Sequence, residues 1–337
     1  MFNPNDTGIK NGNIFGFPYA FEESEIVVVP VCSDITCSYG KGTAFAPQKI
    51  LEESTQLDFY SPYIKNAWEQ KVFMLPINEQ LLAINNKIGA KATHLIQKQE
   101  AGISFTEEDN FILKEVNIFC EQQTENIKNL CLELLNNNKT PIVLGGDHNS
   151  PLGLIQALAE KYDDFGILQI DAHADLRDTY EGFSDSHASI MFNALKRPQI
   201  SKLVQVGVRD ICQDEVDLIN GSNNRIKTFF DWDLKAAQHQ GKTWQQQCDE
   251  IVAELPQNIY ISFDIDGLDP KLCPNTGTPV PGGLEFEQAT YLLNQLTEKG
   301  KKIIGADLCE VGNHQWDANV GARVLYLLST LVFKLKG

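Results

Sequence analysis

Short runs of β-branched and other apolar residues recur along the chain, and longer segments of helical period separate them. Because the short runs are mostly apolar and rich in β-branched residues, they indicate buried strands, as in parallel sheets. The predicted strands are Ile26 to Val31, Val72 to Leu75, Pro141 to Leu144, Phe165 to Ile170, Leu203 to Val208, Ile259 to Phe263 and Ile303 to Leu308. The predicted helices are Pro47 to Leu57, Phe111 to Asn137, Pro151 to Lys161, Phe286 to Glu298 and Val320 to Phe333. This alternation predicts an α/β domain with helices on both faces of a mostly parallel sheet.

The stretch from Pro76 to Asn110 does not fit the alternation, because it is polar, rich in Gln and weakly patterned. A helical insertion, a lid and an excursion over the surface all remain open for residues 76–110. No internal repeat is evident, and we expect residues 1–337 to form a single domain.

Composition narrows the class of protein. The 337 residues carry 28 Lys and Arg against 45 Asp and Glu, a formal net charge of −17. This balance disfavours nucleic acid as a partner, because phosphates attract basic surfaces. An acidic surface favours the approach of a small cation, although it also serves simply as a solubility device.

Several features point to the cytoplasm. The apolar stretches Ile26 to Cys32 and Val324 to Phe333 are shorter than the roughly 20 residues that span a bilayer, so no membrane partner is expected. The start of the sequence lacks a basic and apolar leader. The eight cysteines form no Cys-x-x-Cys pair and are expected to be reduced thiols.

Histidines and aspartates cluster just after three predicted strands, where sites form in open α/β sheets. Gly145-Gly146-Asp147-His148 follows one strand, and its glycines are expected to let the backbone turn and present His148. Asp171, His173 and Asp175 follow the next, and in extended chain they share one face. Asp264 and Asp266 repeat this spacing after a third. The alternative interpretations are a structural histidine at His148 and a network of capping hydrogen bonds at the turn that follows the second strand.

Carboxylates packed this closely would repel one another unless a cation lay between them. Oxygen and nitrogen ligands without a thiolate suit hard or borderline divalent ions, and favour Mn²⁺ over a structural Zn²⁺. Six such side chains exceed what one ion needs, so we expect two ions per chain. The expected ligands are His148, Asp171, His173, Asp175, Asp264 and Asp266.

With these motifs, the chain resembles the ureohydrolase superfamily, which includes arginase and agmatinase, from about Ile26 to the C-terminus. The resemblance implies a three-layer α/β/α sandwich around a largely parallel eight-stranded sheet, and a homo-oligomer, either trimer or hexamer. It also implies hydrolysis of a linear guanidino compound to urea and an amine. One Mn²⁺ would be held by His148, Asp171, Asp175 and Asp264, and the other by Asp171, His173, Asp264 and Asp266.

The resemblance also assigns roles outside metal binding. Asp175 would carry a proton to the leaving nitrogen, His187 would transfer protons and contact substrate, and Glu310 would pair with the guanidinium. A surface or capping role for His187, and a solvated strand-end charge for Glu310, are the alternatives. The run 312–319 departs from the family pattern, which makes His314 and Trp316 candidate contacts.

The substrate is less determined. Arg177 stands where arginases carry an Asn, and the run from Asp175 to His187 looks like that of agmatinases. Agmatine, hydrolysed to putrescine, is therefore the first expectation, because its two charges suit an acidic protein. An inward-pointing Arg177 would instead favour a guanidino acid such as guanidinobutyrate. Arginine, free guanidine with Ni²⁺, and a metal-binding protein without catalysis are the further alternatives.

Overall fold

Eight parallel strands form one sheet in the order β2-β1-β3-β8-β7-β4-β5-β6. The computed structural model describes residues 2–334, so residue 1 and residues 335–337 of the expected domain lie outside the described part. The strands are β1 (Ile26–Pro30), β2 (Val72–Met74), β3 (Thr140–Leu144), β4 (Phe165–Ile170), β5 (Ile200–Val206), β6 (Ile226–Phe229), β7 (Asn258–Asp264) and β8 (Lys302–Cys309). The largely parallel eight-stranded sheet expected from the resemblance is confirmed.

All seven strands predicted from the sequence are present, with ends shifted by a few residues. The eighth strand, β6, was not predicted. It is short and lies at the edge of the sheet, where three of its four residues are half-buried. An edge strand of this kind tolerates Lys227 and Thr228 and so lacks the continuous apolar run that marks the central strands.

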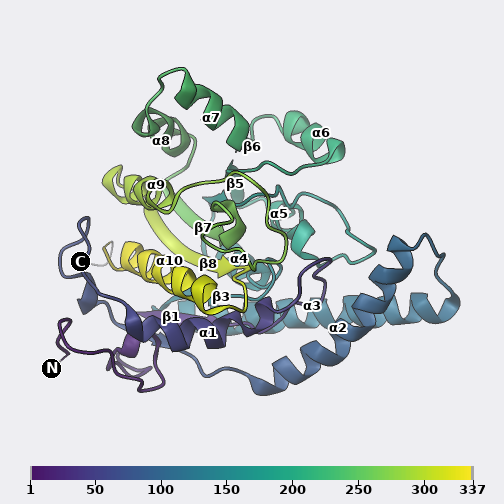
Figure 1. Cartoon of the computed structure of the whole chain (residues 1–337), viewed down its shortest axis with the longest axis horizontal. Coiled ribbons are helices and arrows are strands. Elements are labelled where there is room, and N and C mark those ends of the chain that lie inside the picture. Colours follow the sequence, from purple (N-terminus) through teal and green to yellow (C-terminus); the bar gives the residue numbers. More distant parts are fainter. Residues whose placement is uncertain (1, 335–337) are drawn as a thin grey trace.

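Helices cover both faces of the sheet and complete the three layers (Figure 1). Ile26 and Val28 of β1 face the apolar core that contains the C-terminal helix, whereas Val27 and Val29 face the core on the other side. The α-helices are α1 (Ala46–Glu53), α2 (Glu79–Glu100), α3 (Glu107–Asn136), α4 (Leu152–Lys161), α5 (Ile190–Leu195), α6 (Gln213–Gly221), α7 (Asp231–His239), α8 (Trp244–Ala253), α9 (Phe286–Glu298) and α10 (Gln315–Lys334). The short 3₁₀ helices are η1 (Ile14–Gly16), η2 (Thr43–Phe45), η3 (Ser54–Gln56), η4 (Ala67–Glu69), η5 (His187–Ser189) and η6 (Ile265–Gly267).

The segment 76–110, for which three interpretations were open, contains the helix α2. The side chain of Asn78 caps its N-terminus by accepting a hydrogen bond from the backbone of Leu81. Ile88 and Leu95 of α2 belong to a small apolar core shared with Val116 of α3. The segment is therefore helical and packs on α3, outside the core that fills the two faces of the sheet.

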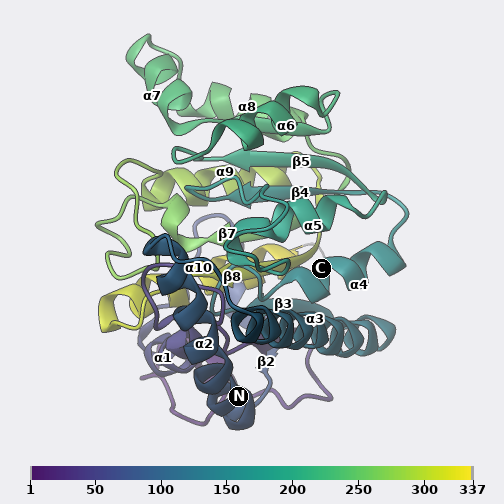
Figure 2. The same cartoon turned by 90° about the vertical axis from the view of Figure 1, so that its right-hand side faces the viewer.

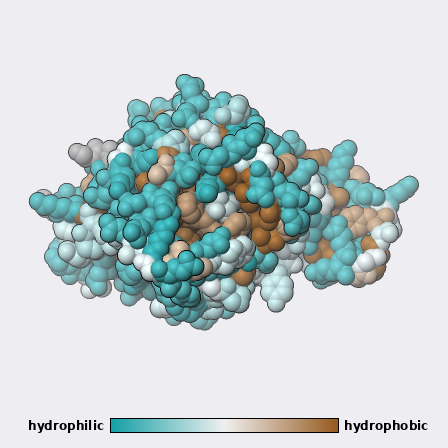
Figure 3. All heavy atoms as spheres, turned by 90° about the horizontal axis from the view of Figure 1, so that it is seen from above, coloured by the Kyte–Doolittle hydropathy of each residue, from teal (hydrophilic) through white to brown (hydrophobic). Residues whose placement is uncertain are grey.

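The surface is largely hydrophilic, with apolar side chains gathered in patches on the face shown in Figure 3. Among residues 2–334, no helix combines the length and the apolar character needed to cross a membrane. The eight cysteines are all unpaired, and every one except the half-buried Cys212 is buried.

The topology places four strand ends side by side. β1 and β2 lie outward of β3 on one side, β5 and β6 lie outward of β4 on the other, and β8 and β7 fill the gap between β3 and β4. Figure 2 shows these strands stacked one above the other. Ligands in open α/β sheets bind at the carboxyl ends of the strands where the order reverses. The carboxyl ends of β3, β8, β7 and β4 meet at this point.

Candidate metal centre

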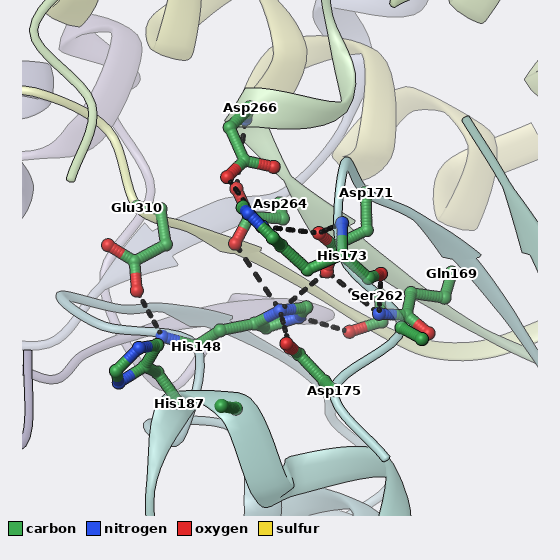
Figure 4. A network of polar contacts seen from close by, with 12 residues as sticks. His148, Gln169, Asp171, His173, Asp175, His187, Ser262, Asp264, Asp266 and Glu310 are labelled. Carbon is green, nitrogen blue, oxygen red and sulfur yellow. Dashed lines mark hydrogen bonds and ion pairs between the residues drawn. The ribbon is translucent and has the colours of Figure 1, made fainter. Parts of the chain in front are cut away.

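The structure brings the expected ligands together at these four strand ends (Figure 4). His148 follows β3, Asp171 and Asp175 follow β4, Asp264 is the last residue of β7 and Glu310 follows β8. His173 and Asp266 complete the group, the latter within η6. Residues 162 positions apart, such as His148 and Glu310, are thereby in direct contact.

The local backbone differs from the extended chain that the spacing suggested. Asp175 has a φ of 54° and Glu310 a φ of 60°, both in the left-handed region that residues other than glycine rarely adopt. Asp266 lies on a 3₁₀ turn, and its backbone N–H donates to Asp264 Oδ1 at 2.9 Å. Backbone strain of this kind concentrates at functional sites, where the surroundings hold it in place.

The two glycines before His148 were expected to allow a sharp turn of the backbone, but their role in the structure is different. Neither Gly145 nor Gly146 has a positive φ. A Cβ on Gly146 would lie 1.9 Å from the backbone oxygen of Ser33. The backbone of Asp147 donates to the same oxygen at 2.8 Å. Glycine is required here because two loops approach closely, and not because the chain makes a left-handed turn.

One cluster surrounds the imidazole of His148. Its Nδ1 lies 2.9 Å from Asp175 Oδ2, 3.0 Å from Asp171 Oδ2 and 3.3 Å from Asp264 Oδ2. Burial alone would lower the pKa of His148, but contacts with Asp171 and Asp175 raise it well above its usual value. Burial and the neighbouring Asp171 raise the pKa of Asp175 to about 7. Burial and the charges of Asp266 and Asp171 raise the pKa of Asp264 well above its usual value.

A second cluster adjoins the first. His173 Nδ1 lies 3.1 Å from Asp266 Oδ2 and 3.6 Å from Asp171 Oδ1, so Asp171 belongs to both clusters. Burial would raise the pKa of Asp171, but its close contacts with the imidazoles of His148 and His173 outweigh burial and lower the pKa. The two groups His148–Asp171–Asp264 and Asp171–His173–Asp266 have the composition and spacing to hold metal ions.

The donor set fits divalent cations. Asp171, Asp175, Asp264 and Asp266 are all at most 5% exposed, and buried carboxylates without a counter-charge are costly. His148 Nδ1 is buried and has no hydrogen-bond partner, although three carboxylates surround it. A cation at the Nδ1 position would satisfy this nitrogen and neutralise its neighbours together.

Ser262 and Asp307, which the sequence reasoning missed, fix the tautomer of His148. The Ser262 hydroxyl donates to Asp307 Oδ2 at 2.8 Å, so Ser262 Oγ accepts from His148 Nε2 at 2.9 Å. With the proton on Nε2, Nδ1 has a free lone pair. The sequence signal that could have identified them is a polar residue inside a mostly apolar strand, Ser262 in β7 and Asp307 in β8.

Glu310 stands beside the metal-ligand group with one oxygen unsatisfied. Its Oε1 accepts from the backbone of His148 at 2.9 Å, whereas Oε2 is buried without a partner. Burial and the nearby Asp147 raise the pKa of Glu310 well above its usual value. The side chain is 4% exposed, so the solvated strand-end charge considered above is excluded.

A cleft of about 420 Å³ opens from solvent onto His173 and Asp175, and Glu310 lies behind them, outside the residues that line the cleft. It is lined by His173, Asp175 and His187 at the site and by Arg177, Tyr180 and Asp210 further out, together with Ser38, Tyr39, Ala188, Ile211, Glu215, Thr278, Pro279 and Val280. His314 and Trp316 are not among the lining residues, and the Trp316 indole donates to the backbone of Lys271 instead. A larger cleft, about 790 Å³ beside α3, contains none of the expected site residues.

His187 lies at the start of η5 and lines the cleft. Burial and the nearby His173 and His148 lower its pKa to about 4, so the imidazole is neutral near pH 7. The imidazole ring packs edge-on against the Tyr180 ring, with the two ring centroids 5.8 Å apart.

Arg209, another residue that the sequence reasoning missed, joins the loops around the cleft. Its guanidinium donates to the backbone oxygens of Asp266, at 2.7 Å, and Val280, at 2.9 Å. It also reaches Gly207 and Leu268. Arg209 follows a predicted strand directly, but nothing in the sequence shows that its partners are carbonyl groups.

Known proteins resemble this chain in sequence and in fold. A family model described as the arginase family matches residues 24–328. An N(1)-aminopropylagmatine ureohydrolase from Thermus thermophilus is 31% identical over 306 residues, covering 90% of this chain and 89% of the relative. An agmatinase from Bacillus anthracis is 27% identical over 301 residues, covering 87% of this chain and 85% of the relative.

A solved structure agrees at the level of the fold. The agmatine ureohydrolase of Thermoplasma volcanium aligns with a TM-score of 0.68 at 22% identity, covering 95% of this chain and 93% of that one. Since the family model spans nearly the whole sheet and its surrounding helices, the chain belongs to the arginase family, the ureohydrolases that cleave carbon–nitrogen bonds of linear amidines.

Proposed function

We propose that the protein is a binuclear, manganese-dependent hydrolase that converts a cationic guanidino amine, agmatine first, to urea and an amine. The observation that carries the proposal is the buried, unpartnered Oε2 of Glu310 beside two adjoining His and Asp clusters. A cationic partner would satisfy this oxygen and favour the ionised carboxylate, and a planar guanidinium is one that a carboxylate orients as well as neutralises.

The metal ions would be held by the six residues expected from the sequence. Asp171 and Asp264 would be shared, with His148 and Asp175 on one side and His173 and Asp266 on the other. When bound, two divalent ions supply water activation near neutral pH. Mn²⁺ suits the carboxylate-rich donor set, and Ni²⁺ is the alternative metal.

The reaction fixes where protons must go. Water adds to the guanidinium carbon, and the bond from that carbon to the substituted nitrogen breaks. The water oxygen ends in urea, and both of its protons end on the leaving nitrogen. A proton carrier beside the reacting atoms is therefore needed, and Asp175 and His187 both line the cleft. Glu310 holds the guanidinium in place during the transfer.

The charges along the cleft support a substrate with a distal amine. Arg177 Nε lies 3.9 Å from Glu215 Oε2, and its guanidinium lies 4.7 Å above the Tyr180 ring. Arg177 thus already has an anionic partner. Asp210 is exposed at the same cleft, and its carboxylate makes no ion pair with any residue of the described chain. An ammonium group at the outer end of the substrate would give it one.

A second candidate follows from the position of Arg177. Its side chain is 39% exposed and lines the cleft, so a substrate carboxylate could compete with Glu215 for it. A guanidino acid such as guanidinobutyrate is therefore the alternative substrate. The cleft volume also leaves room for a longer guanidino polyamine of the kind named for the Thermus relative.

The test is urea release by protein that has been stripped with chelator and then reloaded with Mn²⁺ or Ni²⁺. The panel is agmatine, aminopropylagmatine, guanidinobutyrate, arginine and guanidine. We expect the highest kcat/KM with a guanidino amine and Mn²⁺, and no urea from the stripped protein. A higher kcat/KM with guanidinobutyrate than with the guanidino amines would overturn the proposal that the substrate is a guanidino amine. No urea from any compound with either metal would support the non-catalytic alternative. The trimer or hexamer and the cytoplasmic location stay predictions.

A further inference from the structure

Five polar residues form a row across five neighbouring strands, at the same level of the sheet. The register pairs Asp307 of β8 with Ser262 of β7, Ser262 with Gln169 of β4, Gln169 with Gln205 of β5, and Gln205 with Thr228 of β6. All are fully buried except Thr228, which is half-buried. Polar groups inside a sheet are costly unless each finds a partner.

The arm of the row that starts at the sheet edge ends on the candidate metal centre. Thr228 Oγ1 donates to Gln205 Oε1 at 2.7 Å. Gln205 Nε2 donates to Gln169 Oε1, also at 2.7 Å, and Gln169 Nε2 donates to Asp171 Oδ2 at 2.7 Å. Three side chains thus connect the edge strand to the carboxylate shared by the two clusters (Figure 4 shows the Gln169 end).

The same two amides also hold the loop that carries the ligands. Gln205 Nε2 donates its second hydrogen to the backbone oxygen of Ala174 at 2.7 Å, and Gln169 Nε2 donates its second to that of His173 at 3.3 Å. Both hydrogens of each amide are therefore used. The loop 171–175 is fixed at two carbonyls and one carboxylate.

These partners allow only one orientation of each amide. Gln205 faces two acceptors with its Nε2, and the Thr228 hydroxyl donates to its Oε1. If either amide turned over, an oxygen would face an oxygen. An N–H of Gln169 therefore always points at Asp171. An ionised Asp171 carboxylate accepts this hydrogen bond only when it lies in the position seen here.

We propose that Gln169 and Gln205 are positioning residues that hold the Asp171 carboxylate as the shared ligand of the metal centre, with the Thr228 hydroxyl supplying the donor that Gln205 Oε1 needs at the edge of the sheet. This inference rests on the proposed metal centre, because Asp171 must bind metal for its position to matter. Partners of metal ligands of this kind typically change metal affinity by about 10- to 100-fold when they are removed.

The decisive variant is Gln205→Met, because Gln205 touches no proposed ligand side chain and Met has similar length without donors. We expect Mn²⁺ affinity, measured by EPR titration of free Mn²⁺, to fall by about 10- to 100-fold. Gln169→Met should lose at least as much. The double variant should lose less than the two single losses combined, since part of the effect of Gln205 passes through Gln169 and the rest through the Ala174 carbonyl.

Gln70→Met is the matched control. Gln70 is equally buried and its Nε2 donates to Thr330 Oγ1 at 3.1 Å, beside the opposite edge strand. We expect Gln70→Met, like the other variants, to lower the melting temperature of the metal-free protein because a buried hydrogen bond is lost, but to leave Mn²⁺ affinity unchanged. Equal Mn²⁺ affinities for Gln205→Met and Gln70→Met would overturn the proposal.

Two further outcomes are separable. If the parent protein itself binds no Mn²⁺, the proposed metal centre fails and this inference fails with it, whereas tight binding by both parent and Gln205→Met refutes the inference alone. Should Gln205→Met not fold, Thr228→Val and Thr228→Ser replace it. Thr228→Val removes the hydroxyl and should weaken Mn²⁺ binding, Thr228→Ser keeps it and should not, and equal affinities would again refute the role.

Discussion

Replacing Glu310 by Gln tests the role that the geometry gives to its free oxygen. The change preserves size and shape, and Gln meets the same left-handed backbone at φ 60° that Glu does. However, the Gln amide cannot accept hydrogen bonds both from the backbone of His148 and from the substrate guanidinium. If its oxygen accepts from the backbone of His148, its NH₂ faces the substrate guanidinium, donor against donor. If it turns over, the NH₂ meets the His148 N–H instead.

The size of the effect follows from the burial of this oxygen. Glu310 is 4% exposed, so solvent does not screen its pairing with the guanidinium. Removing one partner of such a buried charge pair costs about 2–5 kcal/mol, or roughly 30- to 5,000-fold in kcat/KM. The metal-free Gln variant should melt no lower than the parent, because it no longer buries an unpaired carboxylate.

The assay compares kcat/KM for agmatine and bound Mn²⁺ in Glu310→Gln, His187→Ala and Glu298→Gln. Glu298 is a surface residue paired with Lys334, so its variant controls for the loss of one negative charge. We expect Glu310→Gln to keep its metal and to lose more activity than His187→Ala, because added imidazole replaces a proton carrier but not an orienting charge. Loss of metal, or activity above that of His187→Ala, would refute the assignment.

Three shorter predictions concern charge, packing and acid stability. Asp210→Asn should lower kcat/KM for agmatine up to about fivefold, the scale of an exposed ion pair of about 0.2–1 kcal/mol, without lowering that for guanidinobutyrate. Gly146→Ala should destabilise the fold by about 1–3 kcal/mol or more in denaturant melts, because its Cβ meets backbone at 1.9 Å. Lys98 and the Thr106 backbone hold the pKa of Asp109 well below its usual value, so this carboxylate stabilises the fold above a pH of about 4 and the effect is lost as pH falls further. Asp109→Asn should therefore flatten the acid side of the stability profile measured by thermal melts, and an unchanged acid slope would contradict it.

Most of the architecture was readable from the chain because the central strands are buried on both faces. Strands such as β4 and β7 are mostly apolar because both of their faces are buried, and such runs are visible without a structure. The edge strand β6 and the helix α2 were harder to predict. β6 is half-exposed, and α2 packs through a narrow apolar stripe that includes Ile88 and Leu95.

The chemistry of the metal centre was also visible, since carboxylates and histidines after buried strands have few structural explanations. The sequence determined the residue types and the strand ends at which they lie. It did not determine how they converge: Asp175 uses left-handed backbone and Asp266 a 3₁₀ turn where extended chain was expected, and Glu310 also uses left-handed backbone. These conformations depend on hydrogen bonds from distant residues, such as the one from Met191 to the backbone of Asp175.

Only the tertiary structure decided which groups remain unpaired. In the sequence, Arg177 and Asp210 are simply two charged residues. In the fold, Glu215 forms an ion pair with Arg177, whereas no described residue forms one with Asp210. Likewise, Gln169 and Gln205 are isolated polar residues in two apolar runs until the strand register aligns them beneath Asp171. Charge compensation and hydrogen-bond direction depend on pairs of residues far apart in the chain, and local sequence carries no record of which pairs the fold will form.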